Sequence, residues 1–238
     1  MSDNAEPIIS LRDVGAFYWR RRSYLHTDKF WALQNVSFDL YHGESLGIIG
    51  RNGAGKSTLL KLLTGIIKPD KGMLINNGVQ AVLLSLGVGF VPYLSGRENA
   101  ILSGMLLGLH KDEIKDKMDD IRQFSELGKF FEEPIMTYSS GMVARLGFSV
   151  AFQLNPDILL IDETLGVGDA EFYKKSSEVI SEKIKSDKTI VLVSHNANVI
   201  QHLCDRVVWI EEGTTQLQGS PMEVLAAYNR YLSDSHRK

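Results

Sequence analysis

One short glycine-rich run constrains the fold of this chain more than any other feature. Its sequence fills every fixed position of a phosphate-binding loop: Gly50-Arg51-Asn52-Gly53-Ala54-Gly55-Lys56-Ser57-Thr58. Residues 46–49 before the loop are apolar, as in a short buried strand, and residues 58–63 after it favour a helix. A strand, a glycine loop and a helix in this order are the setting in which such a loop binds a nucleoside triphosphate. A glycine-rich turn that only connects a strand to a helix would not need all of these positions filled.

Each part of the loop has a chemical role toward the phosphates. The glycines let backbone N–H groups approach them, and the N-terminus of the following helix adds a partial positive charge. We expect Lys56 to reach the β- and γ-phosphates and the Ser57 hydroxyl to bind Mg²⁺. The expected ligands are therefore a nucleoside triphosphate and Mg²⁺.

The composition is that of an ordinary globular protein. Of the 238 residues, 44% are hydrophobic, which is ample for the core of one large α/β domain. The formal net charge of −3 provides no basic field for nucleic acid. We expect the local basic cluster Arg20-Arg21-Arg22 to lie in a solvated loop.

Nothing in the sequence predicts secretion or a membrane-spanning helix. The longest strongly apolar stretch, residues 79–91, is too short to cross a bilayer. The N-terminus lacks the basic and apolar regions of a signal peptide, and the single cysteine, Cys204, has no partner for an intramolecular disulfide. We therefore expect a cytoplasmic protein in which Cys204 is a packed small apolar residue.

Strand patterns lie on both sides of a long span that has none. Segments with the composition of strands are residues 8–14, 36–40, 73–76, 79–85, 158–161, 189–193, 206–211 and 214–218. The first two alternate apolar and polar residues, which indicates an antiparallel β portion. A predicted helix over residues 171–184 separates two continuous apolar strands, and this βαβ order indicates a parallel sheet. The last two strands predict a hairpin through Glu212-Gly213.

The span without strand patterns, about residues 87–155, predicts an inserted α-helical lobe. Ser95-Gly96-Arg97-Glu98 is a capping box that opens a helix toward Leu107, and residues 114–124 carry a helical apolar stripe. A further helix is expected over residues 142–154. A C-terminal helix over about residues 220–238 opens with Pro221.

Two carboxylates and a histidine follow the predicted parallel strands. Asp162 and Glu163 come directly after strand 158–161, and His195 follows strand 189–193. Ligands of open α/β sheets bind at the carboxyl ends of strands. We expect Asp162 to hold Mg²⁺, Glu163 to act as general base toward the attacking water, and His195 to contact the γ-phosphate.

With these residues in view, the chain resembles the nucleotide-binding subunit of ABC transporters, over about residues 8–231. Tyr138-Ser139-Ser140-Gly141-Met142 is similar to the family's signature motif, Leu-Ser-Gly-Gly-Gln, and differs from it at its first, third and fifth positions. The resemblance implies one ABC ATPase domain over residues 1–238. Its fold would be the P-loop NTPase fold with an antiparallel β portion, a mostly parallel core sheet and the helical lobe.

The resemblance also assigns roles to residues outside the phosphate loop. It implies that ATP is the nucleotide and that Glu163, His195 and Lys56 are catalytic. It implies that Ser139, Ser140 and Gly141 bind the ATP held by another subunit, and that Asp169 lies in the loop after the catalytic glutamate. Tyr18 would stack on adenine, with the adjacent Phe17 and Trp19 as alternatives.

The spacing of the signature supports its action in a second subunit. Along the predicted helix, Gly141 lies about 20 Å from the start of the Asp162 strand, which is far for one ATP. A helix N-terminus with Ser139 exposed is still a good anion site. We therefore expect a head-to-tail homodimer that closes around ATP and opens after hydrolysis.

One difference from the common family pattern indicates which kind of ABC transporter the chain resembles. The family's usual glutamine after the β portion is absent from Leu84-Ser85-Leu86-Gly87, while residues 84–90 and 94–99 are similar to exporters of lipid-linked polysaccharide such as O-antigen, capsule and teichoic acid. This implies a separate integral membrane permease, attachment to the cytoplasmic face of the membrane and a glycan as indirect cargo. From the length of the chain we expect no C-terminal carbohydrate-binding domain.

Other functions stay open from the sequence alone. The nearest alternative is an ABC ATPase for another cargo, such as a lipid, a peptide or a drug. A soluble ABC-type ATPase that acts on ribosomes or DNA is disfavoured by the acidic balance and the single nucleotide-binding domain. A non-hydrolysing regulatory module would be expected to lack a lysine or carboxylate, and Lys56, Asp162 and Glu163 are all present.

Overall fold

The structure is a computed structural model of the chain. It describes residues 6–21, 27–84, 89–153, 156–162, 172, 176, 178–179, 182, 188–194 and 196–235. The chain divides into two compact units. The first comprises Met1–Leu83, Asp157–Glu163 and Ile184–Lys238, and the second comprises Leu84–Pro156 and Thr164–Lys183.

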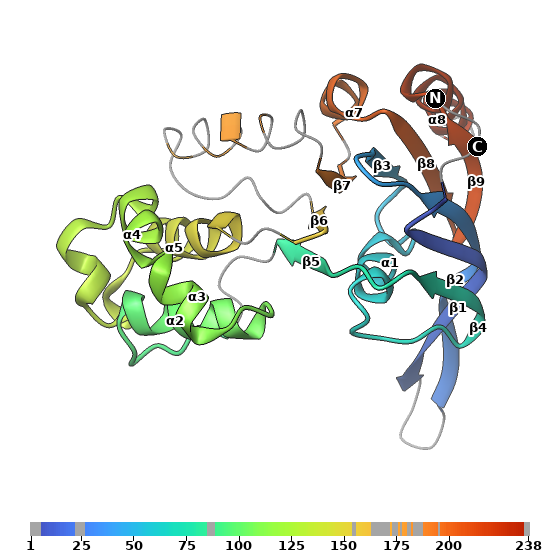
Figure 1. Cartoon of the computed structure of the whole chain (residues 1–238). Coiled ribbons are helices and arrows are strands. Elements are labelled where there is room, and N and C mark those ends of the chain that lie inside the picture. Colours follow the sequence, from blue (N-terminus) through green and yellow to red (C-terminus); the bar gives the residue numbers. More distant parts are fainter. Residues whose placement is uncertain are drawn as a thin grey trace. The chain divides into compact units, whose positions relative to one another are not determined.

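In the described part of the chain, nine strands form one mixed sheet (Figure 1). Their spatial order is β4-β1-β2-β9-β8-β3-β7-β6-β5. The strands are β1 (Ile9–Arg21), β2 (Thr27–Leu40), β3 (Ser45–Ile49), β4 (Lys71–Asn76), β5 (Ala81–Leu84), β6 (Ile158–Ile161), β7 (Thr189–Val193), β8 (Arg206–Glu211) and β9 (Thr214–Gly219). β1 pairs antiparallel with β2 and β4, whereas β3 pairs parallel with β7 and β8, and β6 pairs parallel with β7. The predicted combination of an antiparallel portion and a mostly parallel core is confirmed.

The central strands are buried because their side chains are apolar on both faces. Every residue of β3, β6 and β7 is buried. Helix α1 (Lys56–Leu63) packs four leucines into the same core: Leu59, Leu60, Leu62 and Leu63. The sequence predicted β6, β7 and β8 at their observed bounds, since a strand covered on both sides leaves a continuous apolar run.

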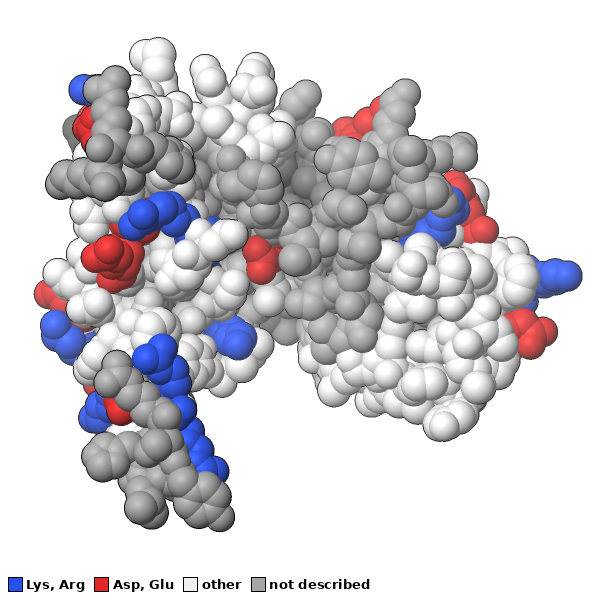
Figure 2. All heavy atoms as spheres, turned by 180° about the vertical axis from the view of Figure 1, so that it is seen from behind, with Lys and Arg blue, Asp and Glu red and all other residues white. Residues whose placement is uncertain are grey.

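The hairpin of β1 and β2 is longer than the alternating segments predicted. Its outer arms, residues 15–21 and 27–35, pair with each other in register up to Arg21 and Thr27. These arms carry aromatic and charged side chains on both faces, so they lack the period-two pattern. The expectation of a loop at the basic cluster is wrong for Arg20 and Arg21, which end β1, although both are exposed. Figure 2 shows basic side chains along this hairpin, and Arg22 lies outside the described residues.

Two further helices of the first unit lie among the residues that the structure describes. Helix α7 (Ala197–Leu203) begins after Asn196, whose side chain accepts hydrogen bonds from two backbone N–H groups. Helix α8 (Pro221–Ser235) opens with proline at its first position, as predicted. Between β8 and β9, Glu212 and Gly213 both have positive φ, 50° and 73°, as a two-residue hairpin turn requires.

The second unit is helical and has its own core. Its elements are α2 (Gly96–Leu106), α3 (Lys111–Asp116), α4 (Met118–Ser125), the 3₁₀ helices η1 (Gly128–Glu132) and η2 (Ile135–Thr137), and α5 (Ser140–Gln153). The predicted capping box is present at α2: Ser95 accepts from the Glu98 amide, and the Glu98 side chain accepts from the Ser95 amide. The apolar stripe is buried as expected, but it spans α3 and α4 rather than one helix.

One predicted helix begins earlier in the structure than expected, and another lies mostly outside the described residues. Helix α5 begins at Ser140, two residues before the predicted start, because Ser139 caps it: the Met142 amide donates to Ser139 Oγ at 3.2 Å. The predicted helix over residues 171–184 lies mostly outside the described residues. The described positions within it, residues 172, 176, 178, 179 and 182, are helical.

Candidate nucleotide-binding site

The phosphate loop connects β3 to α1, as the sequence predicted, and two of its glycines, Gly50 and Gly55, are required by close packing. Gly50 has φ 153°, and a Cβ at this position would lie 2.0 Å from the carbonyl oxygen of Ile210. Gly55 has φ 105°, and a Cβ there would lie 2.5 Å from the carbonyl oxygen of Ala32. Any side chain at either position would therefore force the loop away from the strands beneath it.

Lys56 lies across the loop that it belongs to. Its Nζ donates to the carbonyl oxygens of Gly50, at 2.7 Å, and Arg51, at 3.0 Å. No side chain among the described residues caps the N-terminus of α1. Asn52, Gly53 and Ser57 are exposed. An uncapped helix N-terminus beside a lysine is a good site for phosphate oxygens.

Asp162 lies at the same edge of the sheet as the phosphate loop. In the parallel register, Ile161 of β6 is level with Leu192 of β7, and Val193 of β7 is level with Ile48 of β3. Asp162 therefore follows β6 where Gly50 follows β3, with one strand between them. A carboxylate and the Ser57 hydroxyl are hard oxygen ligands of the kind that Mg²⁺ prefers, so the residues present fit this ion.

Among the three candidate aromatics, Tyr18 is the one beside the phosphate-loop helix. Its hydroxyl accepts a hydrogen bond from Thr58 Oγ1 at 3.4 Å, and the ring centre lies 6.0 Å from Lys61 Nζ. Strand alternation directs Phe17 and Trp19 to the opposite face of the hairpin, where their rings contact each other at 5.5 Å. The structure thus separates the three candidates that the sequence left open.

The signature segment is an exposed turn at the start of α5. Ser139 and Ser140 are exposed, and Gly141 is half-buried. The Tyr138 hydroxyl donates to the carbonyl oxygen of Phe130 at 2.5 Å, and burial raises the pKa of this hydroxyl to about 12. The tyrosine that departs from the family motif therefore anchors the segment to η1.

Several predicted site residues lie outside the described part of the chain. They are Glu163, Asp169 and His195. Residues 85–88, where the family's glutamine is missing, also lie outside it. The nearest described residue to Glu163 in the sequence is Asp162, and the nearest to His195 are Ser194 and Asn196.

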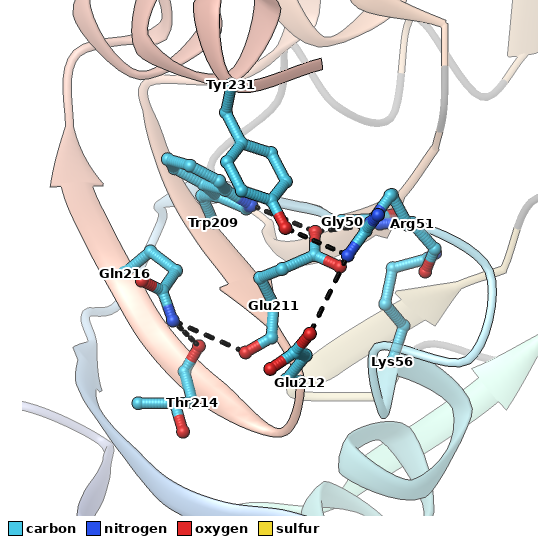
Figure 3. Close-up of polar contacts among 9 residues, drawn as sticks. All are labelled: Gly50, Arg51, Lys56, Trp209, Glu211, Glu212, Thr214, Gln216 and Tyr231. Atoms are coloured by element: carbon cyan, nitrogen blue, oxygen red, sulfur yellow. Dashed lines mark hydrogen bonds and ion pairs between the residues drawn. The ribbon is translucent and has the colours of Figure 1, made fainter. Parts of the chain in front are cut away.

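Sequence reasoning missed Glu211 at the end of β8. This carboxylate is 5% exposed and accepts from Arg51 Nε at 2.7 Å, as Figure 3 shows. The hydrogen bond with Glu211 and its negative charge raise the pKa of Arg51 above its ordinary value. The only signal in the sequence is an acidic residue closing an otherwise apolar strand, and this does not reveal its partner.

The sequence profile of the ABC transporter family matches residues 33–166, which is more than half of the chain. The match runs from β2 through the phosphate loop and the signature segment to a point five residues past the end of β6. The chain belongs to the ABC transporter family. ATP hydrolysis, the predicted activity, is the activity of ABC ATPases, and the predicted enzyme class is confirmed.

Relatives of this ABC ATPase include export proteins. The O-antigen export system ATP-binding protein RfbB of Klebsiella pneumoniae is 48% identical over 205 residues, covering 86% of this chain and 83% of the relative. The teichoic acids export ATP-binding protein TagH of Lactococcus lactis subsp. lactis (strain IL1403) is 47% identical over 203 residues, covering 85% of this chain and 43% of the relative.

Solved structures show the same fold. The ATP-binding cassette MJ0796, as a dimer in a post-hydrolysis state with ADP and Pi, superposes with a TM-score of 0.71 at 21% identity. The alignment covers 90% of this ABC ATPase and 98% of that chain. The predicted ABC ATPase fold is confirmed. None of the helices among the described residues is long and apolar enough to cross a membrane.

Proposed function

We propose that this ABC ATPase is the energy-supplying subunit of an exporter of a lipid-linked polysaccharide such as O-antigen, capsule or teichoic acid. The observation that carries the proposal is the identity of 47–48% to ATP-binding proteins named for O-antigen and teichoic acid export, over 85–86% of this chain. A separate integral membrane permease would move the glycan, and this subunit would sit on the cytoplasmic face of the membrane.

The proposed chemistry is phosphoryl transfer from ATP to water, which proteins accelerate mainly by positioning and charge neutralisation. Lys56 and the first-turn amides of α1 would hold the phosphates. Ser57 and Asp162 would bind Mg²⁺, whose charge would be shared with the β- and γ-phosphate oxygens. Tyr18 would stack on adenine, because it is the candidate that contacts the phosphate-loop helix.

Two residues after the parallel strands would complete hydrolysis. Glu163 follows Asp162 directly and would accept a proton from the attacking water. His195 would contact the γ-phosphate. This part of the proposal rests on sequence positions: Glu163 is one residue after Asp162, and His195 is two residues after Val193.

A second copy of the chain would close the site. Ser139, Ser140 and Gly141 would bind the γ-phosphate held by the partner copy, with Asp169 in the loop between them. The capped but exposed N-terminus of α5 supports this role, since its first-turn amides lie beside small side chains.

Exposed apolar residues of the helical unit support a membrane-protein partner. Tyr93 is 77% exposed and Met136 is 63% exposed. Their segments run side by side, because the Met136 amide donates to the carbonyl oxygen of Pro92 at 2.9 Å. Large apolar side chains gathered on a surface mark interaction sites, and we propose that the permease docks here.

The Glu163→Gln variant tests the hydrolytic part of the proposal. It should bind ATP and dimerise but hydrolyse ATP roughly 10²–10⁴-fold more slowly, as expected when a general base is removed. Near-normal hydrolysis in this variant would remove Glu163 from the role of base.

The cargo is tested in a host strain that lacks this chain. The wild-type chain should restore polysaccharide at the cell surface, whereas Glu163→Gln should leave lipid-linked glycan accumulated inside the cell. Normal surface polysaccharide in the deletion strain, with loss of another transported solute, would favour an ABC ATPase for that other cargo.

A further inference from the structure

We propose that Arg51, Glu211 and Tyr231 form a positioning cluster that holds the phosphate loop from outside and couples helix α8 to nucleotide binding. The inference rests on the proposed role of residues 50–58 in binding ATP and adds residues from the C-terminal part of the chain to that site.

The cluster is a set of short polar contacts centred on Arg51 (Figure 3). Its Nε donates to Glu211 Oε1 at 2.7 Å, and its Nη2 donates to the Tyr231 hydroxyl at 2.8 Å. The Arg51 amide also donates to Glu211 Oε2 at 3.4 Å. One carboxylate thus binds both the side chain and the backbone of the same loop residue.

The parallel pairing of β3 with β8 brings these residues together. Ile49, the last residue of β3, is level with Trp209 of β8. The two residues that follow continue this pairing, so that Gly50 lies beside Ile210 and Arg51 lies beside Glu211. Gly50 packs directly against the backbone of Ile210.

The turn between β8 and β9 also contacts the phosphate loop, in addition to the contacts of Ile210 with Gly50 and of Glu211 with Arg51. The Gly213 amide donates to the carbonyl oxygen of Ala54 at 3.1 Å. The hairpin of β8 and β9 therefore supports the loop at Gly50, Arg51 and Ala54.

The buried carboxylate makes the arginine contact more than a surface ion pair. The side chain of Glu211 is only 6% exposed, and the charge of a buried carboxylate must be compensated by a partner. Arg51 supplies that charge, and Trp209 Nε1 donates to Glu211 Oε2 at 3.4 Å. Moving Arg51 away would leave Glu211 with an uncompensated charge, so the loop is held where it lies.

The same loop residue also sets the position of Lys56. The carbonyl oxygen of Arg51 accepts from Lys56 Nζ at 3.0 Å, while its amide and side chain are bound to Glu211. A change in the backbone at Arg51 would therefore move the point at which Lys56 is held. The cluster should act on nucleotide affinity rather than on the chemical step.

In the part of the chain that the structure describes, helix α8 contacts Arg51 of the loop through the ring and the hydroxyl of Tyr231. The Tyr231 ring packs on Trp209 with ring centres 5.1 Å apart, and Arg51 lies over this ring at 5.2 Å. Tyr228, one helical turn earlier, packs on the same Trp209 at 5.5 Å. In the described part of the chain, Tyr228 makes no hydrogen bond to Arg51. The two tyrosines therefore share their packing but not the polar contact.

The experiment compares Tyr231→Phe with Tyr228→Phe as a matched control. Both remove one hydroxyl from the same face of α8 and keep the ring on Trp209. We measure the ATP Kd by titration, kcat and KM for hydrolysis, and Tm for each variant. Tyr231→Phe should raise Kd and KM by about fivefold with kcat unchanged, as expected for the loss of one hydrogen bond of ordinary net strength. Tyr228→Phe should leave all three constants unchanged.

Glu211→Gln should raise Kd by more, about tenfold or above, because it removes the negative charge that binds the Arg51 guanidinium. Combining it with Tyr231→Phe should give less than the product of the two effects, since both act through Arg51. An unchanged Kd in Tyr231→Phe, or an equal change in Tyr228→Phe, would overturn the inference.

Lys56→Ala separates this inference from the proposed function. If Lys56→Ala binds ATP normally, the proposed site is wrong and the positioning role falls with it. If Lys56→Ala loses ATP binding while Tyr231→Phe keeps it, the proposed site stands and only the positioning role is overturned.

Discussion

The thiol of Cys204 illustrates how burial controls the chemistry of one residue. Its Sγ lies 3.1 Å from where a Cβ on Gly47 would be, against the central strand β3. Burial, and then the negative charge of Asp205, raise the pKa of this thiol to about 12, from an ordinary value of 9.0. Because only the thiolate reacts with disulfide reagents, the native thiol should be unreactive near neutral pH.

We predict that Cys204 in the folded protein reacts with a disulfide reagent about a thousandfold more slowly than in the unfolded chain at pH 8. In the folded protein, the rate of reaction should still rise with pH at pH values above 9.0, the ordinary pKa of a thiol. Absorbance after addition of the reagent measures both rates, with Cys204→Ser as the blank. Similar rates in the folded and unfolded chain would contradict the prediction.

The hydroxyl of Tyr138 gives a second prediction at the residue scale. Removing it in Tyr138→Phe deletes the 2.5 Å hydrogen bond to the carbonyl oxygen of Phe130. The free energy of unfolding should fall by about 1 kcal/mol, measured by urea titration. Tyr93→Phe is the control, since Tyr93 is 77% exposed and should change stability by less than about 0.5 kcal/mol. Equal losses in the two variants would argue against an anchoring role for Tyr138.

At the residue scale, the sequence predicted contacts that depend on neighbours in the chain and missed those that do not. All nine residues of the predicted phosphate loop could be assigned from the sequence because the motif has fixed spacing, and their roles toward ATP stay predictions. The ion pair of Arg51 with Glu211 joins residues 160 positions apart, and no local pattern records such a pair. The contact of Tyr18 with Thr58, which supports Tyr18 over Phe17 as the proposed adenine partner, also depends on the strand register.

Among the elements, helix α2 depends on its capping box. The Glu98 carboxylate accepts from the amide and hydroxyl of Ser95, and these bonds lower its pKa below the ordinary value of 4.5. A carboxylate whose pKa is lowered in the folded state stabilises the protein at pH values above its pKa in the unfolded chain. This contribution is lost as the pH falls through its pKa in the folded protein.

We therefore predict that Glu98→Ala lowers Tm at pH 7 and that the difference from wild type shrinks progressively below pH 4.5. Thermal unfolding followed by circular dichroism across this pH range measures the difference. A Tm difference that stays constant with pH would show that lost packing, rather than the charged cap, explains the effect. Ser95→Ala should cost about 1 kcal/mol as the partner half of the box.

The elements also differ in how well the sequence predicted them. Buried strands such as β6 and β7 were found at their observed bounds, since burial on both faces leaves only apolar residues. The outer arms of the β1–β2 hairpin were missed because no side of the hairpin there is uniformly apolar. Helix α5 begins two residues before the predicted start because the Ser139 hydroxyl accepts a hydrogen bond from the Met142 amide, which has no partner within the helix.

For the whole molecule, the decisive proposal is that each ATP site is shared by two copies. We predict that two inactive variants regain activity when mixed. Lys56→Ala has a defective phosphate loop and an intact signature, whereas Gly141→Asp has the reverse. A mixed head-to-tail dimer contains one site with both parts intact, so it should hydrolyse ATP at roughly half the wild-type rate.

The mixed dimer is purified through two different affinity tags, and its ATPase rate is compared with that of each variant alone. Each variant alone should be inactive. A purified mixed dimer that binds ATP without hydrolysing it would place the signature in the same copy as the loop it serves, contrary to the proposal.

The supports of the phosphate loop come late in the chain, and this bears on how the protein is made. Gly50, Arg51 and Ala54 are held by residues 210–213, and Arg51 also by Tyr231, 180 positions away. A growing chain on the ribosome contains the loop long before these residues have been synthesised. Contacts of such high sequence separation form slowly, because the loop between them must be closed first. The nascent chain should therefore bind ATP more weakly until α8 has emerged from the ribosome, and a chain that stalls before α8 should be a weak binder of ATP.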